Sequence, residues 1–370
     1  MERTPNKTLI IRLSSIGDIV LASPLIRLLR KKNSQAQTDF LVKSEYRELV
    51  RYNPHLRYVI EFDTHGGFAG LRALRKKIRQ ERYDAIVDIH GNFRSTFLRS
   101  KASPTVLKVN KRRLARFFLA NFKWNIYRSV AAVPIRYLEA VRSLGIGDDG
   151  GGLEVFVPEE TSVRVWDQLS KAGIDGQGHV VGLCPGAKHA TKRWLRQYFE
   201  QLAVALVKED NAELLLFGGK DDQEICASIE RRVVQDTGRR GDILNYAGAL
   251  SLLETASAMD ACDVIVANDS GLLHLAAARK RRVVAIFGPT VKEFGFYPYG
   301  TESKVIERQG LYCRPCTHIG GQTCPEGHFR CMKEITVEEV LNGVRSFSGG
   351  EASDKNKNPS LEPATQIPAI

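Results

Sequence analysis

The chain has 370 residues, 43% of them hydrophobic, and a formal net charge of +12 at pH 7. This length suits two domains better than one. A mean hydropathy of −0.23, without any apolar run of bilayer length, argues against a membrane-spanning protein. The sequence pI of about 9.4 favours anionic partners, among them nucleic acid, anionic lipid and phosphorylated sugars. Residues 1–5 lack a basic start followed by an apolar stretch, so we expect no secretory signal and a cytoplasmic location.

Strand and helix signals alternate along the first half of the chain. Strands are predicted at 8–13, 38–42, 58–62 and 85–88, and helices at 19–32, 44–52, 68–81 and 134–144. Strands separated by helices of this length indicate βαβ units and a parallel sheet. The pattern is interrupted by a basic, aromatic-rich segment at 112–128. It then breaks at the glycine-rich stretch 145–152, which is typical of a linker.

The alternation restarts in the second half. Strands are predicted at 180–184, 213–217, 264–267 and 283–287, and helices at 195–208, 221–234, 251–261 and 272–278. We therefore expect an α/β protein with two doubly wound, Rossmann-like domains that face one another across a cleft. Their predicted bounds are 1–158 and 159–335. A helix at 336–347 closes the fold, and the polar segment 348–370 is predicted to be a disordered tail.

Three turns that follow strands could carry chemistry, because ligands of such sheets bind beyond the carboxyl ends of the strands. The first is the Ser-Ser-Ile-Gly-Asp turn at residues 14–18. Asp18 could be an ordinary helix N-cap. It is also well placed to act as a general base, taking a proton from an acceptor hydroxyl, if neighbouring N–H groups keep it ionised.

The second turn, residues 185–194, reads Pro-Gly-Ala-Lys-His-Ala-Thr-Lys-Arg-Trp. Its glycine would let a phosphate approach the backbone, and Lys192 or Arg193 could neutralise that phosphate. The GxxxxGK[ST] pattern is absent, so ATP hydrolysis has no support. The alternative is an ordinary solvated lysine on a turn.

The third turn, Asn-Asp-Ser-Gly-Leu-Leu-His at 268–274, lies between an apolar strand and a helix. Backbone N–H groups at Ser270 and Gly271 would form an anion site at the helix N-terminus, suited to a diphosphate. Asp269 would repel a phosphate, so we expect it to meet sugar hydroxyls or Lys192. His274, one turn further on, could face the same anion or be a structural histidine. Simple helix capping is the alternative for the turn as a whole.

Two basic clusters and a cysteine-rich loop remain. The first cluster is Arg72, Arg75, Lys76, Lys77 and Arg79, and the second is Lys108, Lys111, Arg112, Arg113, Arg116 and Lys123. Either could be a solvated helix face. The loop at 313–331 contains Cys313, Cys316, Cys324 and Cys331. In a reducing cytoplasm this spacing suggests a zinc knuckle more than disulfides, although free thiols packing a small lobe are also consistent with it.

Taken together, these motifs resemble glycosyltransferase family 9, the ADP-heptose:lipopolysaccharide heptosyltransferases. The resemblance covers almost the whole chain except its tail, and the cysteine-rich loop is similar to that of heptosyltransferase II-type members. It implies a GT-B fold and a metal-independent, inverting transfer of heptose from an ADP-sugar to the lipopolysaccharide inner core. No cofactor is implied. The enzyme would be cytoplasmic and peripheral to the inner face of the cytoplasmic membrane, where its phosphorylated acceptor is anchored.

The resemblance also implies roles for individual residues. Asp18 matches the catalytic base, and Lys192 the lysine on the donor diphosphate. The remaining donor-binding matches are Asp269 near the sugar, Ser270, Gly271 and His274 at the phosphate turn, Leu250 at the adenine, and Asp222 or Glu224 at the ribose. One departure is that Lys188 and His189 follow Gly-Ala, where some members carry paired threonines. Either Thr191 takes over the hydroxyl role, or extra positive charge holds the diphosphate.

The basic residues of the first half are expected to bind the phosphorylated acceptor. These acceptor-binding residues are Arg94, Lys111, Arg112 and Arg113. Two other classes of function stay open, a nucleotide-sugar epimerase with the same two-domain architecture and a nucleic-acid-binding protein. The basic residues avoid the cysteine-rich loop, so we expect no nucleic acid partner. No metal ligand and no stable protein partner are predicted.

Overall fold

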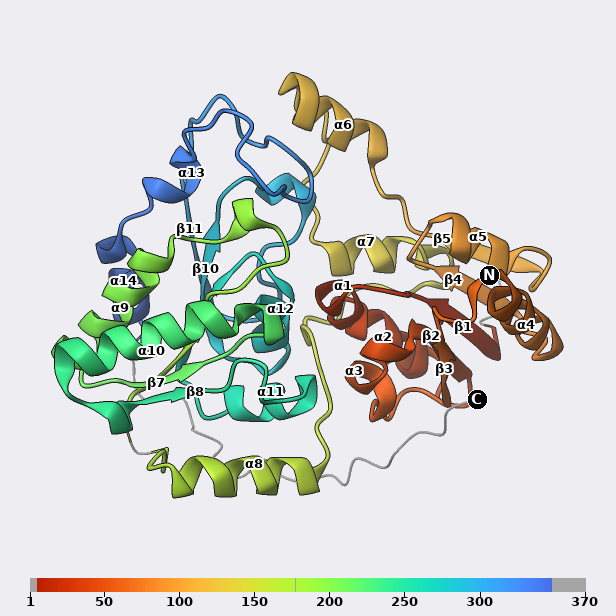
Figure 1. The fold of residues 1–370 in the computed structure, drawn as a ribbon. Coiled ribbons are helices and arrows are strands. Elements are labelled where there is room, and N and C mark those ends of the chain that lie inside the picture. The colour runs from red at the N-terminus through yellow and green to blue at the C-terminus, as the bar shows by residue number, and fades with distance from the viewer. Residues whose placement is uncertain (1–4, 177, 348–370) are drawn as a thin grey trace. The chain divides into compact units, whose positions relative to one another are not determined.

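The computed structural model describes residues 5–176 and 178–347 (Figure 1). The chain forms two compact units. The first contains residues 5–112 and 131–158, and the second contains 113–130 and 159–347. The sequence prediction includes 113–130 in the N-terminal domain, whereas the structure joins this segment to the second unit. The predicted tail 348–370 lies outside the described residues.

A five-stranded parallel sheet forms the centre of the first unit, in the order β3-β2-β1-β4-β5. Its strands are β1 (Lys7–Ile11), β2 (Gln37–Lys43), β3 (Tyr58–Phe62), β4 (Ala85–Asp88) and β5 (Thr105–Lys108). The helices are α1 (Ile16–Val20), α2 (Ser23–Lys32), α3 (Glu48–Arg51), α4 (Gly67–Gln80), α5 (Phe93–Arg99) and α7 (Val133–Glu139), with short 3-10 turns η1 (Ser44–Tyr46) and η2 (Arg142–Leu144). The central strand is apolar on both faces, as expected of a parallel strand buried between helices.

The predicted helix 19–32 is in fact two helices, and the break matters for the site. Pro24 lies in the first turn of α2, where the missing N–H costs nothing, whereas within a continuous helix it would disrupt the hydrogen-bond ladder. The Ser23 hydroxyl donates to the Val20 carbonyl across the break, at 2.8 Å. As a result, Asp18 lies in its own five-residue helix, α1, directly beyond β1.

The glycine-rich stretch 145–152 is not the linker that the sequence predicts. Arg27 of α2 pairs with Asp149 at 2.8 Å and with Glu154 at 2.6 Å, and it donates to the Gly152 carbonyl at 3.1 Å. These contacts fix the stretch to the first unit. The chain passes to the second unit only after Pro158.

The second unit contains a six-stranded parallel sheet in the order β11-β10-β9-β6-β7-β8. The strands are β6 (Val180–Cys184), β7 (Glu213–Leu216), β8 (Ile243–Asn245), β9 (Val264–Asn268), β10 (Arg282–Phe287) and β11 (Ser303–Glu307). The helices are α6 (Arg113–Phe122), α8 (Glu159–Lys171), α9 (Arg196–Glu209), α10 (Gln223–Thr237), α11 (Leu252–Met259), α12 (Gly271–Ala278), α13 (Arg330–Lys333) and α14 (Val337–Arg345). Four 3-10 turns complete the unit: η3 (Ala190–Lys192), η4 (Lys220–Asp222), η5 (Arg240–Asp242) and η6 (Lys292–Phe294). The two sheets confirm the prediction of two doubly wound α/β domains.

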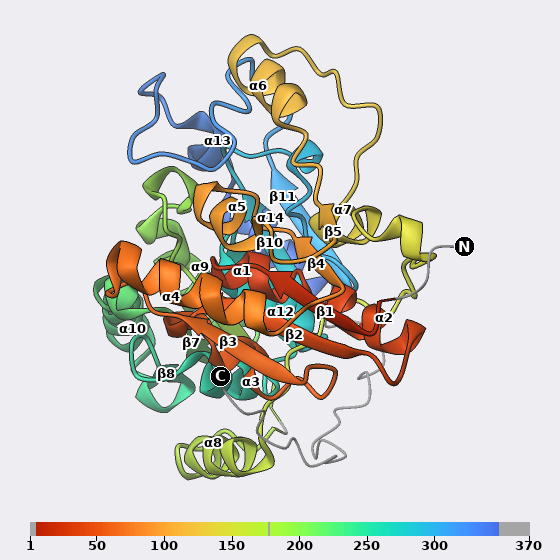
Figure 2. The ribbon, with the colours of Figure 1, turned by 90° about the vertical axis from the view of Figure 1, so that its right-hand side faces the viewer.

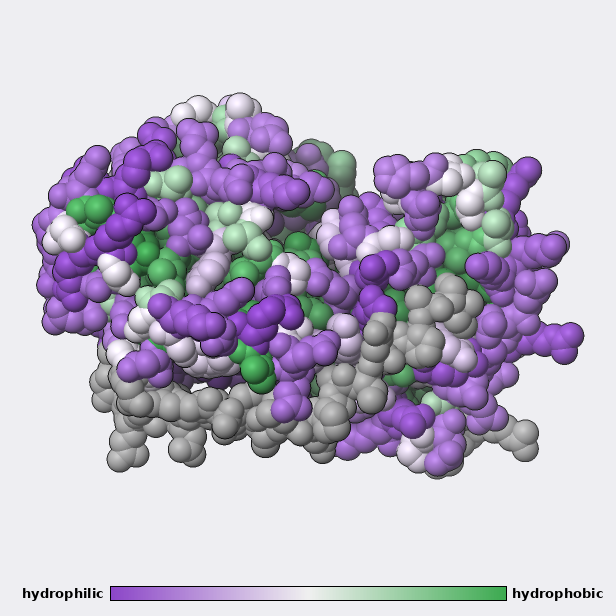
Figure 3. All heavy atoms as spheres, turned by 60° about the horizontal axis from the view of Figure 1, so that its bottom comes forward, coloured by the Kyte–Doolittle hydropathy of each residue, from purple (hydrophilic) through white to green (hydrophobic). Residues whose placement is uncertain are grey.

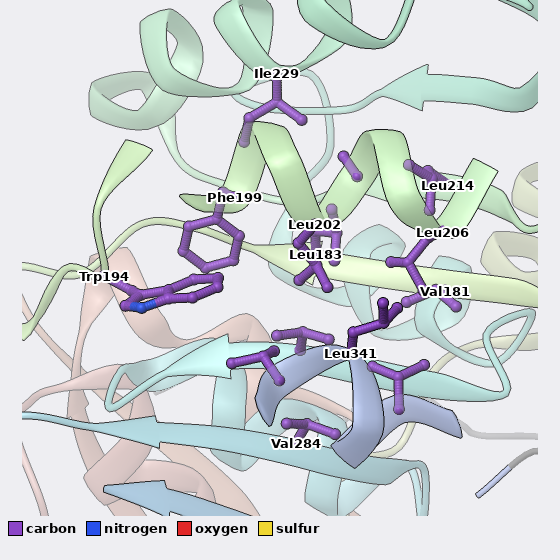
Figure 4. Close-up of a cluster of buried hydrophobic side chains, with 14 of the residues drawn as sticks. Val181, Leu183, Trp194, Phe199, Leu202, Leu206, Leu214, Ile229, Val284 and Leu341 are labelled. Carbon is purple, nitrogen blue, oxygen red and sulfur yellow. The ribbon is translucent and has the colours of Figure 1, made fainter. Parts of the chain in front are cut away.

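The core of the second unit lies between its sheet and the helices α9 and α14. Figure 4 shows Phe199, Leu202 and Leu206 of α9, spaced at helical intervals, over the strand that carries Val181 and Leu183. Trp194 is buried beside them, and its indole N–H donates to the Ile335 carbonyl at 3.0 Å. This packing fixes the turn before α9, which carries Lys192. By contrast, the molecular face in Figure 3 is mainly hydrophilic, with small hydrophobic patches.

Candidate active site

In the first unit the predicted residues follow β1, β4 and β5, which are neighbours in the sheet. Asp18 lies beyond β1, residues 89–95 follow β4, and Lys111 follows β5. Because the strands are parallel, their carboxyl ends meet at one edge of the sheet, where a ligand can reach all three segments.

Asp18 is held by side chains from three segments of the first unit. The Arg12 Nη2 lies 2.7 Å from Asp18 Oδ1, and the Tyr137 hydroxyl lies 3.4 Å from the same oxygen. The Ser15 hydroxyl donates to Asp18 Oδ2 at 3.2 Å. Arg12 is fixed in turn, because its Nη1 donates to the Ile89 carbonyl at 2.8 Å. The Asp18 side chain keeps 20% of its surface exposed, so a substrate can still reach it.

These contacts decide the ionisation of Asp18. Burial raises the pKa of its carboxyl, but the charge and hydrogen bond of Arg12, together with the Ser15 bonds, outweigh burial and hold this pKa below its ordinary value. Burial raises the pKa of the Tyr137 hydroxyl, so this group stays protonated. Asp18 is therefore a carboxylate at neutral pH. The interpretation of Asp18 as the helix N-cap is wrong, because Ser15 is the N-cap and Asp18 is the third residue of α1.

The turn after β4 is ordered by Asp88, which is itself buried. Its Oδ1 accepts hydrogen bonds from the N–H groups of His90, at 3.1 Å, and Gly91, at 2.8 Å. Its Oδ2 pairs with Arg99 at 2.9 Å. Burial and the charges of Arg12 and Lys111 lower the pKa of His90 to about 4, so its imidazole is neutral at neutral pH. Asp88 therefore fixes the shape of this turn.

The four predicted acceptor-binding residues are divided between the two units. Arg94 is exposed on α5, with its guanidinium 6.0 Å from the centre of the Phe62 ring. The Lys111 side chain packs against Gly91, because a Cβ added at Gly91 would lie only 3.1 Å from the Lys111 Cε. Arg112 pairs with Glu139 at 3.2 Å, which partly offsets its charge. Arg113 begins α6, in the second unit.

In the second unit Lys192 and Asp269 form an ion pair across two neighbouring strands, β6 and β9. The Lys192 Nζ lies 2.7 Å from Asp269 Oδ2, and the Thr290 hydroxyl donates to that oxygen at 2.6 Å. The Asp269 side chain is only 5% exposed, against 13% for Lys192. Asp269 therefore orients the Lys192 side chain. The contact agrees with the expectation that Asp269 lies near Lys192.

The third turn is built into the sheet by Asn268. Its side-chain oxygen accepts a hydrogen bond from the backbone N–H of Trp194 at 3.0 Å, and its side-chain NH₂ donates to the Pro185 carbonyl at 2.8 Å. These two bonds connect the turns after β6 and β9. Ser270 is the N-cap of α12, and its buried hydroxyl has no hydrogen-bond partner among the described residues. A hydroxyl and the free N–H groups of a helix start suit an anion. His274 is buried on the same helix, 6.3 Å from the Phe296 ring centre.

The sequence suggests the Thr191 hydroxyl as a contact to the donor diphosphate, but in the structure this hydroxyl bonds with Gly321 of the cysteine-rich loop. Its hydroxyl donates to the Gly321 carbonyl at 3.0 Å and accepts from the Gly321 N–H at 2.8 Å. Gly320, with φ +95°, packs where an added Cβ would lie 2.9 Å from the His189 Cβ. The single hydroxyl proton of Thr191 is thus engaged, so the residue joins the cysteine-rich loop to the lysine turn. Burial and the charges of Lys192 and Lys188 lower the pKa of His189, consistent with a cationic turn.

The remaining donor candidates surround the same edge of the second sheet. Leu250 is half-buried before α11, and Glu224 is exposed in the first turn of α10. Asp222 contributes to packing: its Oδ2 accepts from the Gly219 N–H at 3.0 Å, and it fills the space beside Gly186, where an added Cβ would approach it to 2.3 Å. Of the two ribose candidates, Glu224 is therefore the more exposed carboxylate.

Sequence reasoning missed the partners of Asp18. The sequence predicts Arg12 within the first strand, whereas it follows that strand, and a charged residue at the end of an apolar run is the signal that marks it. Tyr137, far away in sequence, gave no such signal. The four cysteines of the loop are all free thiols. Within residues 5–176 and 178–347, no group of three or more His, Cys, Asp or Glu side chains is arranged to hold a metal ion.

Comparison with known proteins shows the family to which the chain belongs. The chain is 28% identical over 335 residues to lipooligosaccharide heptosyltransferase 2 of Campylobacter jejuni, covering 90% of this chain and 95% of that protein. The glycosyl transferase family 9 structure from Veillonella parvula matches with a TM-score of 0.77 at 21% identity, over 92% of this chain and 97% of that one. The E. coli ADP-heptose lps heptosyltransferase II structure matches with a TM-score of 0.70 at 24% identity, over 92% and 98%. The family model that matches residues 71–327 is described as "Glycosyltransferase family 9 (heptosyltransferase)". The chain therefore belongs to glycosyltransferase family 9.

Proposed function

We propose that this enzyme transfers a heptose from an ADP-activated donor to a hydroxyl of the lipopolysaccharide inner core, with inversion at the anomeric carbon. The observation that carries the proposal is the Arg12–Asp18 pair, which keeps a partly exposed carboxylate ionised beyond the central strand of a family 9 chain. The names of the curated relatives support the choice of sugar and acceptor.

Asp18 is the proposed general base. As the acceptor oxygen forms its bond to the anomeric carbon, the hydroxyl proton moves to the Asp18 carboxylate. The bond from the anomeric carbon to the diphosphate oxygen breaks, and ADP leaves with that electron pair. A low pKa makes Asp18 a modest base, but it guarantees the ionised form, and the hydroxyl becomes more acidic as the new bond forms.

Lys192 is the proposed counter-charge for the leaving diphosphate. Its ammonium group is more exposed than its partner Asp269, so it can contact a phosphate while Asp269 holds it in position. The start of α12, with the hydroxyl and backbone N–H of Ser270 and the backbone N–H of Gly271, would receive the other phosphate oxygens. We propose His274, Leu250 and Glu224 as further donor contacts, and Arg94, Lys111, Arg112 and Arg113 as contacts to the phosphorylated acceptor.

The test is a transfer assay with ADP-heptose in the presence and absence of an inner-core acceptor. We expect ADP release only with acceptor present, and a product of inverted anomeric configuration. Turnover of the nucleotide sugar without acceptor would indicate an epimerase instead. In a thermal-shift series, ADP should stabilise the protein more than UDP or GDP, and equal effects of the three would contradict an adenine-specific donor site. We further propose that the enzyme acts at the inner face of the cytoplasmic membrane.

A further inference from the structure

The segment 113–130, which we call the aromatic–basic segment, concentrates the exposed apolar side chains of this protein. Eleven large hydrophobic side chains are exposed in the described part of the chain, and six of them belong to this segment. They are Leu114 (73% exposed), Phe117 (53%), Phe122 (52%), Trp124 (63%), Ile126 (50%) and Val130 (53%). A concentration of this kind marks an interaction surface, whereas isolated exposed apolar residues do not.

The segment does not use its rings to build the core of the second unit. Its aromatic residues contact one another: the Phe118 and Trp124 rings stack 6.0 Å apart, and Phe117 and Phe122 lie 5.8 Å apart. Leu119 is the buried residue of the helix. Figures 1 and 2 show α6 away from the faces of the six-stranded sheet.

Two hydrogen bonds nevertheless fix the segment to the second unit. The Lys123 Nζ donates to the Pro315 carbonyl of the cysteine-rich loop at 2.7 Å, and the Asn125 side chain donates to Glu293 at 3.1 Å. The exposed rings are therefore held in a defined position on a folded support.

The charged residues near these rings in the sequence all have one sign. No Asp or Glu occurs between Asp88 and Glu139, whereas residues 89–138 contain eleven Lys and Arg residues. Within α6 the residues Leu114, Phe118 and Phe122 recur every four residues along one face. Phe117 lies at the edge of that face beside Arg113, and Arg116 lies further round the helix. A helix with an aromatic and leucine face flanked by cations is typical of helices that lie in the interfacial layer of a membrane.

We propose that the aromatic–basic segment docks the enzyme on the surface of an anionic phospholipid bilayer. The rings of Phe117, Phe122 and Trp124 enter the headgroup and acyl boundary, where amphipathic aromatic groups are favoured, and the surrounding cations meet the lipid phosphates. A second copy of the chain is a poorer partner for this surface, because two such basic segments would repel one another. The inference extends the proposed function, whose acceptor is anchored in a membrane, but lipid binding is measured without any transfer reaction.

The first experiment measures binding of the full chain to vesicles. Flotation with vesicles of phosphatidylcholine and phosphatidylglycerol at 3:1 should carry the protein upward, and vesicles of phosphatidylcholine alone should carry at least tenfold less. Trp124 is a built-in probe, because the other two tryptophans, Trp166 and Trp194, are half-buried and buried. Lipids brominated in their acyl chains should quench its fluorescence, and Trp124→Phe should lose that quenching. Absence of vesicle binding, or quenching that persists in Trp124→Phe, would overturn the proposal.

The second experiment compares two sets of substitutions of exposed apolar residues. The test variant is Phe117→Ser/Phe122→Ser/Trp124→Ser, and the control is Phe68→Ser/Val163→Ser, whose residues are 53% and 60% exposed outside the segment. The test variant should bind 3:1 vesicles at least tenfold more weakly, with an unchanged melting temperature, and the control should bind like the wild type. Equal losses in both variants would contradict a specific docking segment.

Activity and oligomeric state separate this inference from its alternatives. The test variant should retain transfer to a water-soluble, deacylated acceptor and lose transfer to an acceptor embedded in 3:1 vesicles. If the wild type transfers to neither acceptor but still binds vesicles, the proposed function fails while membrane docking stands. If the wild type is a dimer in gel filtration and the test variant is a monomer that binds vesicles normally, the segment is a self-association surface and the proposal is wrong.

Discussion

The two units carry the same kind of ion pair at the same edge of the same kind of sheet, but they expose opposite members of it. In the first unit Arg12 and Asp18 are 2.7 Å apart, and the carboxylate is the more exposed group, at 20% against 11%. In the second unit Lys192 and Asp269 are also 2.7 Å apart, and the cation is the more exposed group, at 13% against 5%.

This difference supports the roles that we propose for the two pairs. A cation that is buried behind a carboxylate keeps that carboxylate ionised and presents it as a proton acceptor. A carboxylate buried behind a lysine, and fixed by the Thr290 hydroxyl, orients the ammonium group and presents it as a counter-charge. Asp18 and Lys192 each follow the first strand of their sheet, and we propose that the order of burial within each pair fits one to an acceptor hydroxyl and the other to a leaving phosphate.

The largest effect is expected for Asp18→Asn, which keeps the shape of the side chain but removes its basicity. We expect kcat to fall by about 10²- to 10⁴-fold, the usual contribution of a general base, with the affinity for ADP changed by less than about twofold. Steady-state transfer assays measure kcat, and titration calorimetry measures the affinity for ADP.

Asp149→Asn is the matched control for that variant. Asp149 is also paired with an arginine of the first unit, Arg27, at 2.8 Å and with 17% of its side chain exposed, but it comes after the η2 turn and not after a strand. We expect it to lower stability without a comparable loss of kcat. If both variants lose activity equally, or if Asp18→Asn loses ADP binding as well, Asp18 has a structural role and the assignment is wrong.

The second prediction concerns the Lys192–Asp269 ion pair of the second unit. Lys192→Met should weaken binding of ADP and of the ADP-sugar by about 10- to 100-fold, since hydrogen bonds to charged groups contribute about 1.5–3 kcal/mol. The neighbouring and exposed Lys188 provides the control, and Lys188→Met should change binding by less than about threefold. Similar losses in the two variants would indicate a diffuse positive field instead of a specific contact.

The third prediction concerns the pH dependence of the first pair. Arg12 favours the ionised form of Asp18 and lowers its pKa, so removing that charge raises the pKa. Activity that needs the carboxylate is lost as pH falls through this pKa. In Arg12→Gln the acidic limb of the kcat/KM profile should therefore move to higher pH, by about one to three units. Arg27→Gln, the cation of the control pair, should leave the limb in place, and an unshifted limb in Arg12→Gln would refute the coupling.

The strands that the sequence does not predict all lie at a sheet edge, although β3, which is also at an edge, is predicted with its exact bounds. The strands at 58–62, 85–88 and 180–184 have the bounds that were predicted. The strands β5, β8 and β11 were missed, and all three are at sheet edges. Because one side of an edge strand is open, it needs no continuous apolar run, and β5 indeed has no buried residue.

The site could be predicted only as far as local sequence carries information. Lys192, Asp269 and Ser270 stand in turns that directly follow strands, and topology then brings those turns together. The partners of Asp18 could not be found in this way, because Tyr137 lies 119 residues away in the chain. The contact of Thr191 with Gly321 depends on how a long loop folds back, which no local pattern encodes.

The smallest effect is expected for the contact between Thr191 and Gly321. Its loss distinguishes between two interpretations of Thr191. If its hydroxyl holds the cysteine-rich loop against the lysine turn, Thr191→Val should raise the donor KM about three- to tenfold at nearly constant kcat, because two hydrogen bonds of about 0.5–1.5 kcal/mol are lost. The same change should release the loop and speed the labelling of the half-buried Cys316 and Cys324 by a thiol reagent. Thr191→Ser keeps the hydroxyl and should restore both values. If Thr191 binds the donor diphosphate directly, KM rises while thiol labelling stays at the wild-type rate, since the loop would then remain closed.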